Sequence, residues 1–237
     1  MSLDRQDGER DRVGAAFAKS VAALDALQKA VGRVPEHLLH KNSARNGTEF
    51  DPNGYFTALT HLSMEEGYVL DYVYYYGQRS GHPVLFTRAV GGSCAIPTAE
   101  QLCQSENYGV SHLDHVRCDG TPEGYFELAL FASQASRFYF YDHALYGKRA
   151  VIPEKSAITH DLVRKEEADL LARMQDAFIP PDITILDDKG RVTVSFCTFS
   201  YWIGLIREEY KMCAAFPHLI SNTVSTTLCP YHCGLMF

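Results

Sequence analysis

Apolar residues near the start of the chain have the spacing of an amphipathic helix. They recur every three or four positions: Val13, Phe17, Val21, Leu24, Leu27 and Val31. This spacing aligns them on one face of a helix, which we expect over Arg10–Val31. Gly32 and Pro35 then end the helix, because neither residue continues helical backbone easily. Residues 1–10 are mostly polar, and we expect them to be flexible.

A second helix is expected after Asp51. The Asp51 side chain is suited to the N-cap position, and Pro52 fits the first turn of a helix. We predict that this helix covers residues 53–66. On such a helix His61 and Glu65 lie four residues apart, so their side chains share one face.

Two segments with the composition of strands follow, and they predict a β-hairpin. Residues 68–76 (YVLDYVYYY) are rich in β-branched and aromatic residues and are bounded by glycines. A turn that contains glycine then leads to a second strand over residues 83–90. We expect these two strands to pair antiparallel.

The middle of the chain is expected to be mainly helical. Thr98 and Gln101 have the spacing of a capping box, which predicts the start of a short helix. We further predict a long, aromatic-rich helix over residues 123–146 and another helix over residues 159–178. Residues 107–122 show no regular pattern.

The last part of the chain is predicted to contain a second hairpin. Residues 183–186 and 192–202 have the composition of strands and flank a turn at residues 187–190 (DDKG). After Gly204 we expect the chain to bend into a helix that ends near Ala215.

Together these elements predict an α+β fold. Few of the expected strands are separated by the single helix that a parallel crossover needs, so the sheet should be largely antiparallel. We expect it to be built from the two hairpins and covered by about four to six helices. The chain has 237 residues, 46% of them apolar and 22% charged, which is typical of a globular protein. No Pro/Gly/Ser-rich linker interrupts its middle, so we expect a single globular domain over residues 1–237.

Charge and hydropathy exclude some classes of partner. The net charge is −7 and no basic stripe occurs, so nucleic acid is not expected as a partner. No apolar run has the roughly 18 residues that a membrane-spanning helix needs, so a membrane partner is not expected either. The polar N-terminus lacks the apolar core of a secretion signal. We therefore expect a cytoplasmic location with reduced cysteines.

One cluster consists of residue types that bind metals. His112, His115 and Cys118 follow one another at spacings of three, and imidazole and thiolate are preferred ligands of zinc. Asp114 is a candidate for a fourth ligand or for orienting one of the histidines. Zinc is therefore a candidate cofactor for this cluster. The alternative is a polar loop whose histidines contact the backbone and solvent.

A second candidate site is formed by polar and aromatic residues of the two hairpins. Alternation along the strands places tyrosines together in the first hairpin and Thr, Ser and Tyr side chains together in the second. If helices cover such a face, its polar groups need partners or a ligand, as in a binding pocket. The predicted ligand-binding residues are His61, Glu65, Tyr72, Tyr74, Thr193, Ser195 and Tyr201. The alternative is that this face is open to solvent and that the tyrosines reflect strand propensity.

Three functional hypotheses therefore remain open. The first is a small-molecule-binding protein, with or without catalytic activity, whose site lies between the sheet and the helices. The second is a metal-binding protein that uses the His/Cys cluster. The third is a non-catalytic interaction or oligomerisation protein. It is supported by the apolar ending Leu235–Phe237, which favours burial against the chain itself or against another subunit of a homo-oligomer.

Overall fold

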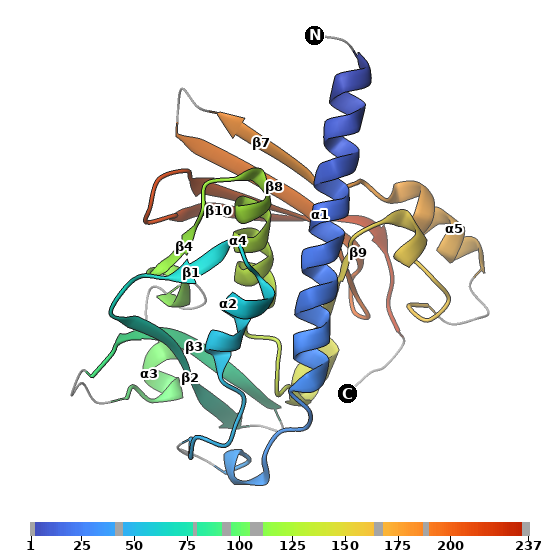
Figure 1. Cartoon of the computed structure of the whole chain (residues 1–237). Coiled ribbons are helices and arrows are strands. Elements are labelled where there is room, and N and C mark those ends of the chain that lie inside the picture. Colours follow the sequence, from blue (N-terminus) through green and yellow to red (C-terminus); the bar gives the residue numbers. More distant parts are fainter. Residues whose placement is uncertain are drawn as a thin grey trace.

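The computed structural model of the chain contains five α-helices and ten strands in its described part (Figure 1). The described residues are 3–40, 45–77, 80–91, 96–104, 111–163, 168–186 and 190–233. The helices are α1 (Leu3–Ala30), α2 (Tyr55–Ala58), α3 (Ala99–Cys103), α4 (Pro122–Gln134) and α5 (Ala168–Ala177), and none of these is long and apolar enough to cross a membrane. The strands are β1 (Leu62–Met64), β2 (Tyr68–Gly77), β3 (Ser80–Ala89), β4 (Val116–Cys118), β5 (Tyr141–Asp142), β6 (Arg149–Ile152), β7 (Asp182–Leu186), β8 (Arg191–Ser200), β9 (Gly204–Cys213) and β10 (Ile220–Pro230). All strand pairs of the described residues are antiparallel, so the predicted α+β class is confirmed.

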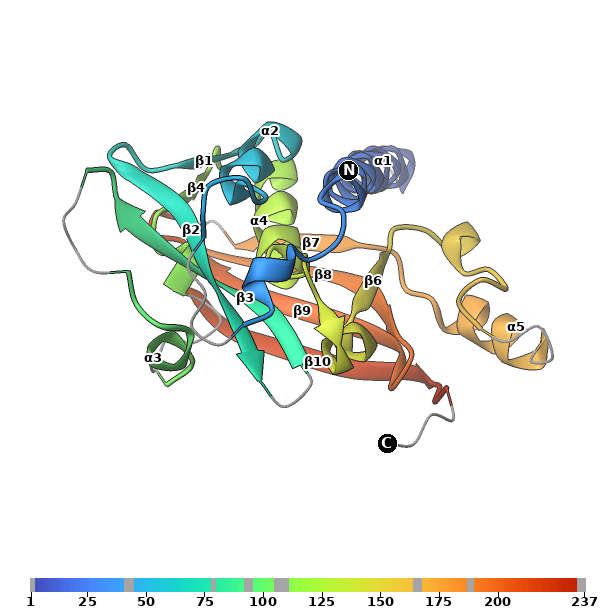
Figure 2. The same cartoon turned by 90° about the horizontal axis from the view of Figure 1, so that it is seen from below.

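The largest sheet has the strand order β10-β9-β8, and both β6 and β7 pair with the remaining edge of β8. β7 pairs with residues 191–195 and β6 with residues 197–200, so this edge is shared between two strands. Helices α1 and α4 lie on one face of the sheet, while α5 lies beside the end farther from the β2–β3 hairpin (Figure 2). Phe17 of α1 packs between Phe126 of α4 and Phe196 of β8, with ring centroids 5.1 and 5.3 Å apart. Aromatic packing therefore joins the two helices to the sheet.

The second sheet consists of the long hairpin β2–β3 and the short strand β5. Its inner face belongs to the main core, where the Tyr72 ring meets the Phe138 ring edge-on at 4.9 Å. Helix α3 lies on the other side of the hairpin from α2 (Figure 2). The hairpin is thus covered on both faces, and Val84 and Phe86 are buried although they lie outside the main core.

The third sheet pairs β1 with β4, with Leu62 opposite Cys118. The buried carboxylate of Glu127 on α4 holds the turn before β1. It accepts a hydrogen bond of 2.8 Å from the His61 backbone N–H and one of 2.9 Å from the Ser20 hydroxyl of α1. The carboxylate therefore connects α1, α4 and the entry to β1.

Several local predictions are confirmed. Both predicted hairpins form, as β2–β3 and β7–β8. The capping box is present: the Thr98 hydroxyl accepts from the Gln101 backbone at 3.2 Å, and the Gln101 side chain accepts from the Thr98 backbone at 2.8 Å. The first helix also forms, but it begins at Leu3 rather than Arg10, so most of the segment expected to be flexible is helical.

The arrangement of the hairpins differs from the prediction. The expected single sheet is wrong, because the hairpins belong to two different sheets and a third sheet is present. Strands β6 and β10 were not predicted. The expected cover of several helices is also not found, since α2 and α3 are single turns.

The predicted helix over residues 53–66 is wrong. Helical backbone ends at Leu59, whose φ and ψ are −103° and 87°, and the chain then enters β1. Leu59 and Leu62 are both buried in the core. Burial of these two leucines and pairing with β4 outweigh the local preference for helix.

The long helix predicted over residues 123–146 is also too long. Helix α4 ends at Gln134, and Tyr139 and Asp142 have positive φ angles of 52° and 49°. The turn in this segment brings Phe138 and Tyr139 into the core, where a continued helix would carry them away. Of the helix predicted over residues 159–178, only the part that forms α5, Ala168–Ala177, is confirmed.

The helix predicted after Gly204 is a strand, β9. Its buried residues alternate, as Ile206, Glu208, Tyr210 and Met212 do. Because one of these interior positions is a glutamate, the sequence does not show the apolar alternation of a strand.

The entry to β9 generates a testable prediction. Gly204 has φ of 100°, and a Cβ atom there would overlap the backbone of Cys229 and Tyr231. Gly204→Ala should therefore lower the free energy of unfolding by about 2–4 kcal/mol, measured by urea denaturation.

Gly14→Ala is the matched control. A Cβ atom at Gly14 meets nothing within 4 Å, and the residue lies inside α1. Alanine there should raise the free energy of unfolding by about 0.5–1 kcal/mol. Equal effects of the two substitutions would contradict the strand geometry at Gly204.

Candidate functional site

A pocket of about 460 Å³ lies against the β2–β3 hairpin, on the side that α3 covers. We call it the hairpin pocket. It is lined by Arg45, Gly47, residues 71–76 of β2, Arg88 of β3 and residues 96–100 at the start of α3. Segments from four separate parts of the sequence therefore form its walls.

Alternation along β2 gives the strand two different faces. Leu70, Tyr72 and Tyr74 belong to the main core. The residues between them belong to the opposite face, which includes Asp71 and Val73. Asp71 is nevertheless only 8% exposed, so its carboxylate must find donors within the protein.

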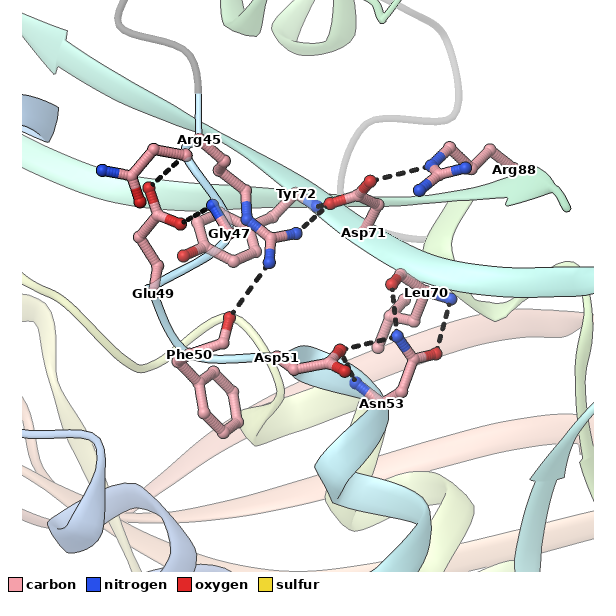
Figure 3. Close-up of polar contacts among 11 residues, drawn as sticks. Arg45, Gly47, Glu49, Phe50, Asp51, Asn53, Leu70, Asp71, Tyr72 and Arg88 are labelled. Carbon is pink, nitrogen blue, oxygen red and sulfur yellow. Dashed lines mark hydrogen bonds and ion pairs between the residues drawn. The ribbon is translucent and has the colours of Figure 1, made fainter. Parts of the chain in front are cut away.

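Two arginines supply these donors, as Figure 3 shows. Arg45 Nη1 donates to one Asp71 oxygen, and Arg88 Nε donates to the other at 2.8 Å. The Tyr72 backbone N–H adds a third hydrogen bond, of 2.9 Å. Two guanidinium groups and one carboxylate leave this cluster with a net charge of +1.

Arg45 is held by contacts on several sides. Its guanidinium carbon lies 4.4 Å from the centre of the Tyr72 ring, and its Nη2 donates to the Phe50 carbonyl at 3.4 Å. Its Nε is buried and has no hydrogen-bond partner among the described residues. The Tyr72 hydroxyl is also buried without a hydrogen-bond partner among the described residues. Burial has the largest influence on the pKa of Tyr72 and raises it above its ordinary value. The hydroxyl therefore stays protonated and can donate.

The segment that carries Arg45 is anchored by Glu49, which points back to the chain before it (Figure 3). Glu49 accepts from the backbone N–H groups of Asn46 and Gly47 at 2.7 and 2.8 Å, and His37 Nε2 lies 2.6 Å from it. Burial raises the pKa of Glu49, but these hydrogen bonds outweigh it and bring the pKa to about 2. The carboxylate thus stays ionised and fixes the loop.

A second anchor lies at Asn53. Its side-chain amide donates to the Leu70 carbonyl and accepts from the Leu70 N–H, both at 2.9 Å (Figure 3). The amide takes the place of a neighbouring strand at the edge of β2. The segment from Arg45 to Asn53 is therefore attached to β2 at both ends.

The predicted ligand-binding residues are divided between the two large sheets. Tyr72 and Tyr74 belong to the strand that lines the hairpin pocket, but their side chains are buried in the main core, where the Tyr74 hydroxyl donates to the Tyr139 carbonyl at 2.8 Å. Thr193, Ser195 and Tyr201 lie in or next to β8, in the other sheet. The Ser195 hydroxyl accepts from Arg207 at 2.6 Å, and Tyr201 is 43% exposed.

His61 and Glu65 do not share a helix face. His61 Nδ1 lies 2.7 Å from an Asp119 oxygen, and the Asp119 carboxylate is the first cause that raises the pKa of His61. Glu65 instead accepts from Arg117 at 2.7 Å and lies 2.8 Å from His115. The two residues thus have separate partners, away from the hairpin pocket.

The three predicted zinc ligands also have separate surroundings. His112 is buried near Phe131, and burial lowers its pKa to about 4. The other two lie on β4 or next to it, where Cys118 Sγ is 3.4 Å from His218 Nε2 and His115 is bound to Glu65. No group of three His, Cys, Asp or Glu side chains that could hold a metal is found in the described part of the chain.

The central residues of the pocket were missed from the sequence. Asp71 had a signal, because it is the one acidic residue of the strand YVLDYVYYY. A carboxylate at that position has to be either exposed or paired. Arg45 had none, since it lies in a polar stretch 26 residues before Asp71.

The anchor at Glu49 yields a prediction for Glu49→Gln. The pKa of Glu49 is lower in the folded protein than its ordinary value of 4.5, so its stabilising effect is present above pH 4.5 and is lost as the pH falls toward about 2. The substitution should lower the free energy of unfolding by about 1–3 kcal/mol at pH 7. Urea denaturation should show this difference shrinking below pH 4.5.

Glu36→Gln serves as the control, because Glu36 is exposed and lies close by in sequence. It should change stability by less than about 0.5 kcal/mol at any pH. A difference between Glu49→Gln and the wild type that persists unchanged at pH 3 would contradict the anchoring role of the charge.

Similarity to known proteins does not identify this chain: no protein-family model matches it, and neither the curated proteins nor the solved structures give a match. Its function is therefore inferred from the geometry and chemistry of the hairpin pocket.

Proposed function

We propose that the protein binds a small molecule in the hairpin pocket. The observation that carries this proposal is the Arg45–Asp71–Arg88 cluster in the wall of a cavity of about 460 Å³. Ligand pockets typically measure about 300–1,000 Å³ and combine apolar walls with a few placed polar groups. The hairpin pocket has both features, because its lining also includes the apolar residues Ile96 and Pro97, which precede α3.

One unpaired donor belongs to the wall of the pocket. Arg45 Nε is buried, belongs to a lining residue, and has no partner among the described residues. A buried donor without an acceptor costs about 1–3 kcal/mol. A ligand or ordered water that accepts from it removes this cost.

The lining residues favour binding over nucleophilic catalysis. The described walls contain no histidine, cysteine, serine or lysine. The hydroxyl of Thr98 is used in the capping box of α3. A general base with a nucleophile beside it, as acyl transfer needs, is therefore not offered by these residues.

Filling the pocket tests the proposal. Val73 lines it and is only partly buried, so Val73→Trp should place the larger ring in the cavity. We expect fragments that bind the wild type in ligand-observed NMR to lose at least about tenfold in affinity. The fragment mixture should contain aromatic and aliphatic acids, amides and alcohols.

Leu219→Trp is the matched control, because Leu219 is 57% exposed and lies outside the pocket lining. It should leave fragment binding unchanged. Circular dichroism should show that both variants fold. The proposal is refuted if no fragment binds the wild type, or if fragments bind the wild type and Val73→Trp with equal affinity.

A specific feature also favours the oligomerisation hypothesis. The predicted contact Leu235–Phe237 lies outside the described residues. The strand β10, however, pairs with β9 on one side, and no described strand pairs with its other side. Its residues 220–228 (ISNTVSTTL) carry no charge, whereas exposed edge strands usually carry charges that prevent association. We propose that β10 pairs antiparallel with β10 of a second copy of this chain.

Light scattering tests this second proposal. Val224 lies near the middle of β10 and is 40% exposed, so Val224→Lys should convert a dimer of the wild type into a monomer. Val90→Lys, at a 62% exposed position after β3, should leave the mass unchanged. If the wild type is a monomer even at about 100 micromolar, the proposed dimer is refuted.

A further inference from the structure

We infer that the ligand of the hairpin pocket is an organic monoanion, an apolar body that carries one carboxylate, and that Arg88 binds the carboxylate. This inference rests on the proposed function. It follows from three features of the pocket: the single carboxylate of Asp71 that Arg88 shares with Arg45, the unused donors of Arg88 and the composition of the opposite wall.

Arg88 has no carboxylate of its own. It shares Asp71 with Arg45, and no second ion pair of Arg88 is found among the described residues. Glu100 brings the formal charge of the lining residues to zero, so the attraction for an anion is local to Arg88 and is not a property of the whole pocket.

Arg88 has the geometry to receive that anion. Asp71 binds its Nε, which fixes the plane of the guanidinium group. No hydrogen bond of its two terminal nitrogens is found among the described residues, and the side chain is 45% exposed. The two terminal N–H groups form a fork that matches the two oxygens of a carboxylate. Arg45, in contrast, uses its terminal nitrogens on Asp71 and Phe50.

The opposite wall favours a carboxylate with an apolar body over phosphate. Ile96 and Pro97 line the pocket there, and Ile96 is 63% exposed without a ligand. Tyr75 and Tyr76 add aromatic surface. Glu100 also lines this wall, and together with Asp71 it would repel a dianion more strongly than a monoanion.

Binding of matched acids and amides tests the inference. The probes are phenylacetate and hexanoate, their neutral amides, and inorganic phosphate, each titrated calorimetrically into the full chain. We expect at least one acid to bind about tenfold or more tightly than its amide, and phosphate to bind more weakly than that acid. Raising the salt concentration should weaken the binding of the acid and leave the binding of the amide unchanged.

Variants of Arg88 locate the carboxylate. Arg88→Gln should reduce the affinity of the acid to that of the amide and leave the amide unchanged. Arg88→Lys keeps the charge but loses the fork, so its affinity for the acid should lie between those of the wild type and Arg88→Gln. Arg173→Gln, at an exposed position of α5, is the control and should have no effect. Arginine side-chain NMR of the wild type gives a readout that needs no variant: the acid should shift the Arg88 resonances.

The outcomes separate this inference from the proposed function. If the amides bind as tightly as the acids and this binding is lost in Val73→Trp, the proposed function stands, but the inference that the ligand carries a carboxylate is wrong. Phosphate that binds more tightly than either acid would overturn it as well, in favour of an inorganic or phosphoryl anion. If no probe binds at millimolar concentration, this inference fails, while the fragment screen with Val73→Trp decides separately on the proposed function.

Discussion

A carboxylate that is removed from water must accept hydrogen bonds from other parts of the chain, and this requirement connects the main elements of the structure. The described part of the chain buries Glu49, Asp71, Glu127 and Glu208. Glu208 takes its donors from four elements: Ser133 of α4, Arg149 of β6, Thr198 of β8 and Tyr210 of β9. Glu127 joins α1 to the turn before β1. Removal of one such carboxylate would therefore leave donors unpaired in several elements at once.

The buried carboxylates differ in how their charge is balanced. Burial raises the pKa of Glu208, but hydrogen bonds from Tyr210, Arg149 and Thr198 outweigh it and the pKa falls below its ordinary value. Glu127 receives hydrogen bonds from neutral groups, and burial raises its pKa. Asp71 differs from both, because two arginines share it and the three side chains belong to the wall of a pocket. Asp71 thus lies in the lining of the candidate pocket, whereas Glu208 and Glu127 connect elements within the core.

The same carboxylates explain how much could be predicted from the sequence. Both hairpins and α1 follow from short-range patterns, since alternation and helical spacing of apolar residues need no distant partner. Glu208 occupies an interior position of β9, so the alternation that marks a strand is broken and the segment resembles a helix. The pairing of β1 with β4 and the contact of Arg45 with Asp71 join segments far apart in the sequence. No local pattern carries this information, so the strand that contains Asp71 could be predicted but not the arginines that pair with it.

The site depends on how the edge of β2 is covered. An edge strand exposes backbone N–H and C=O groups, and here the Asn53 amide binds those of Leu70 while the Asp71 carboxylate accepts from the Tyr72 N–H. The same segment positions Arg45. The Phe50 carbonyl accepts a hydrogen bond from Arg45, and the Phe50 N–H donates to the Tyr139 hydroxyl at 3.1 Å. Arg45 is thus held by the same contacts that cover the strand edge, and through Asp71 it is connected to Arg88. Side chains that the protein fixes in this way lose little conformational entropy when they contact another group, so protection of the strand edge and order in the lining of the pocket have the same structural cause.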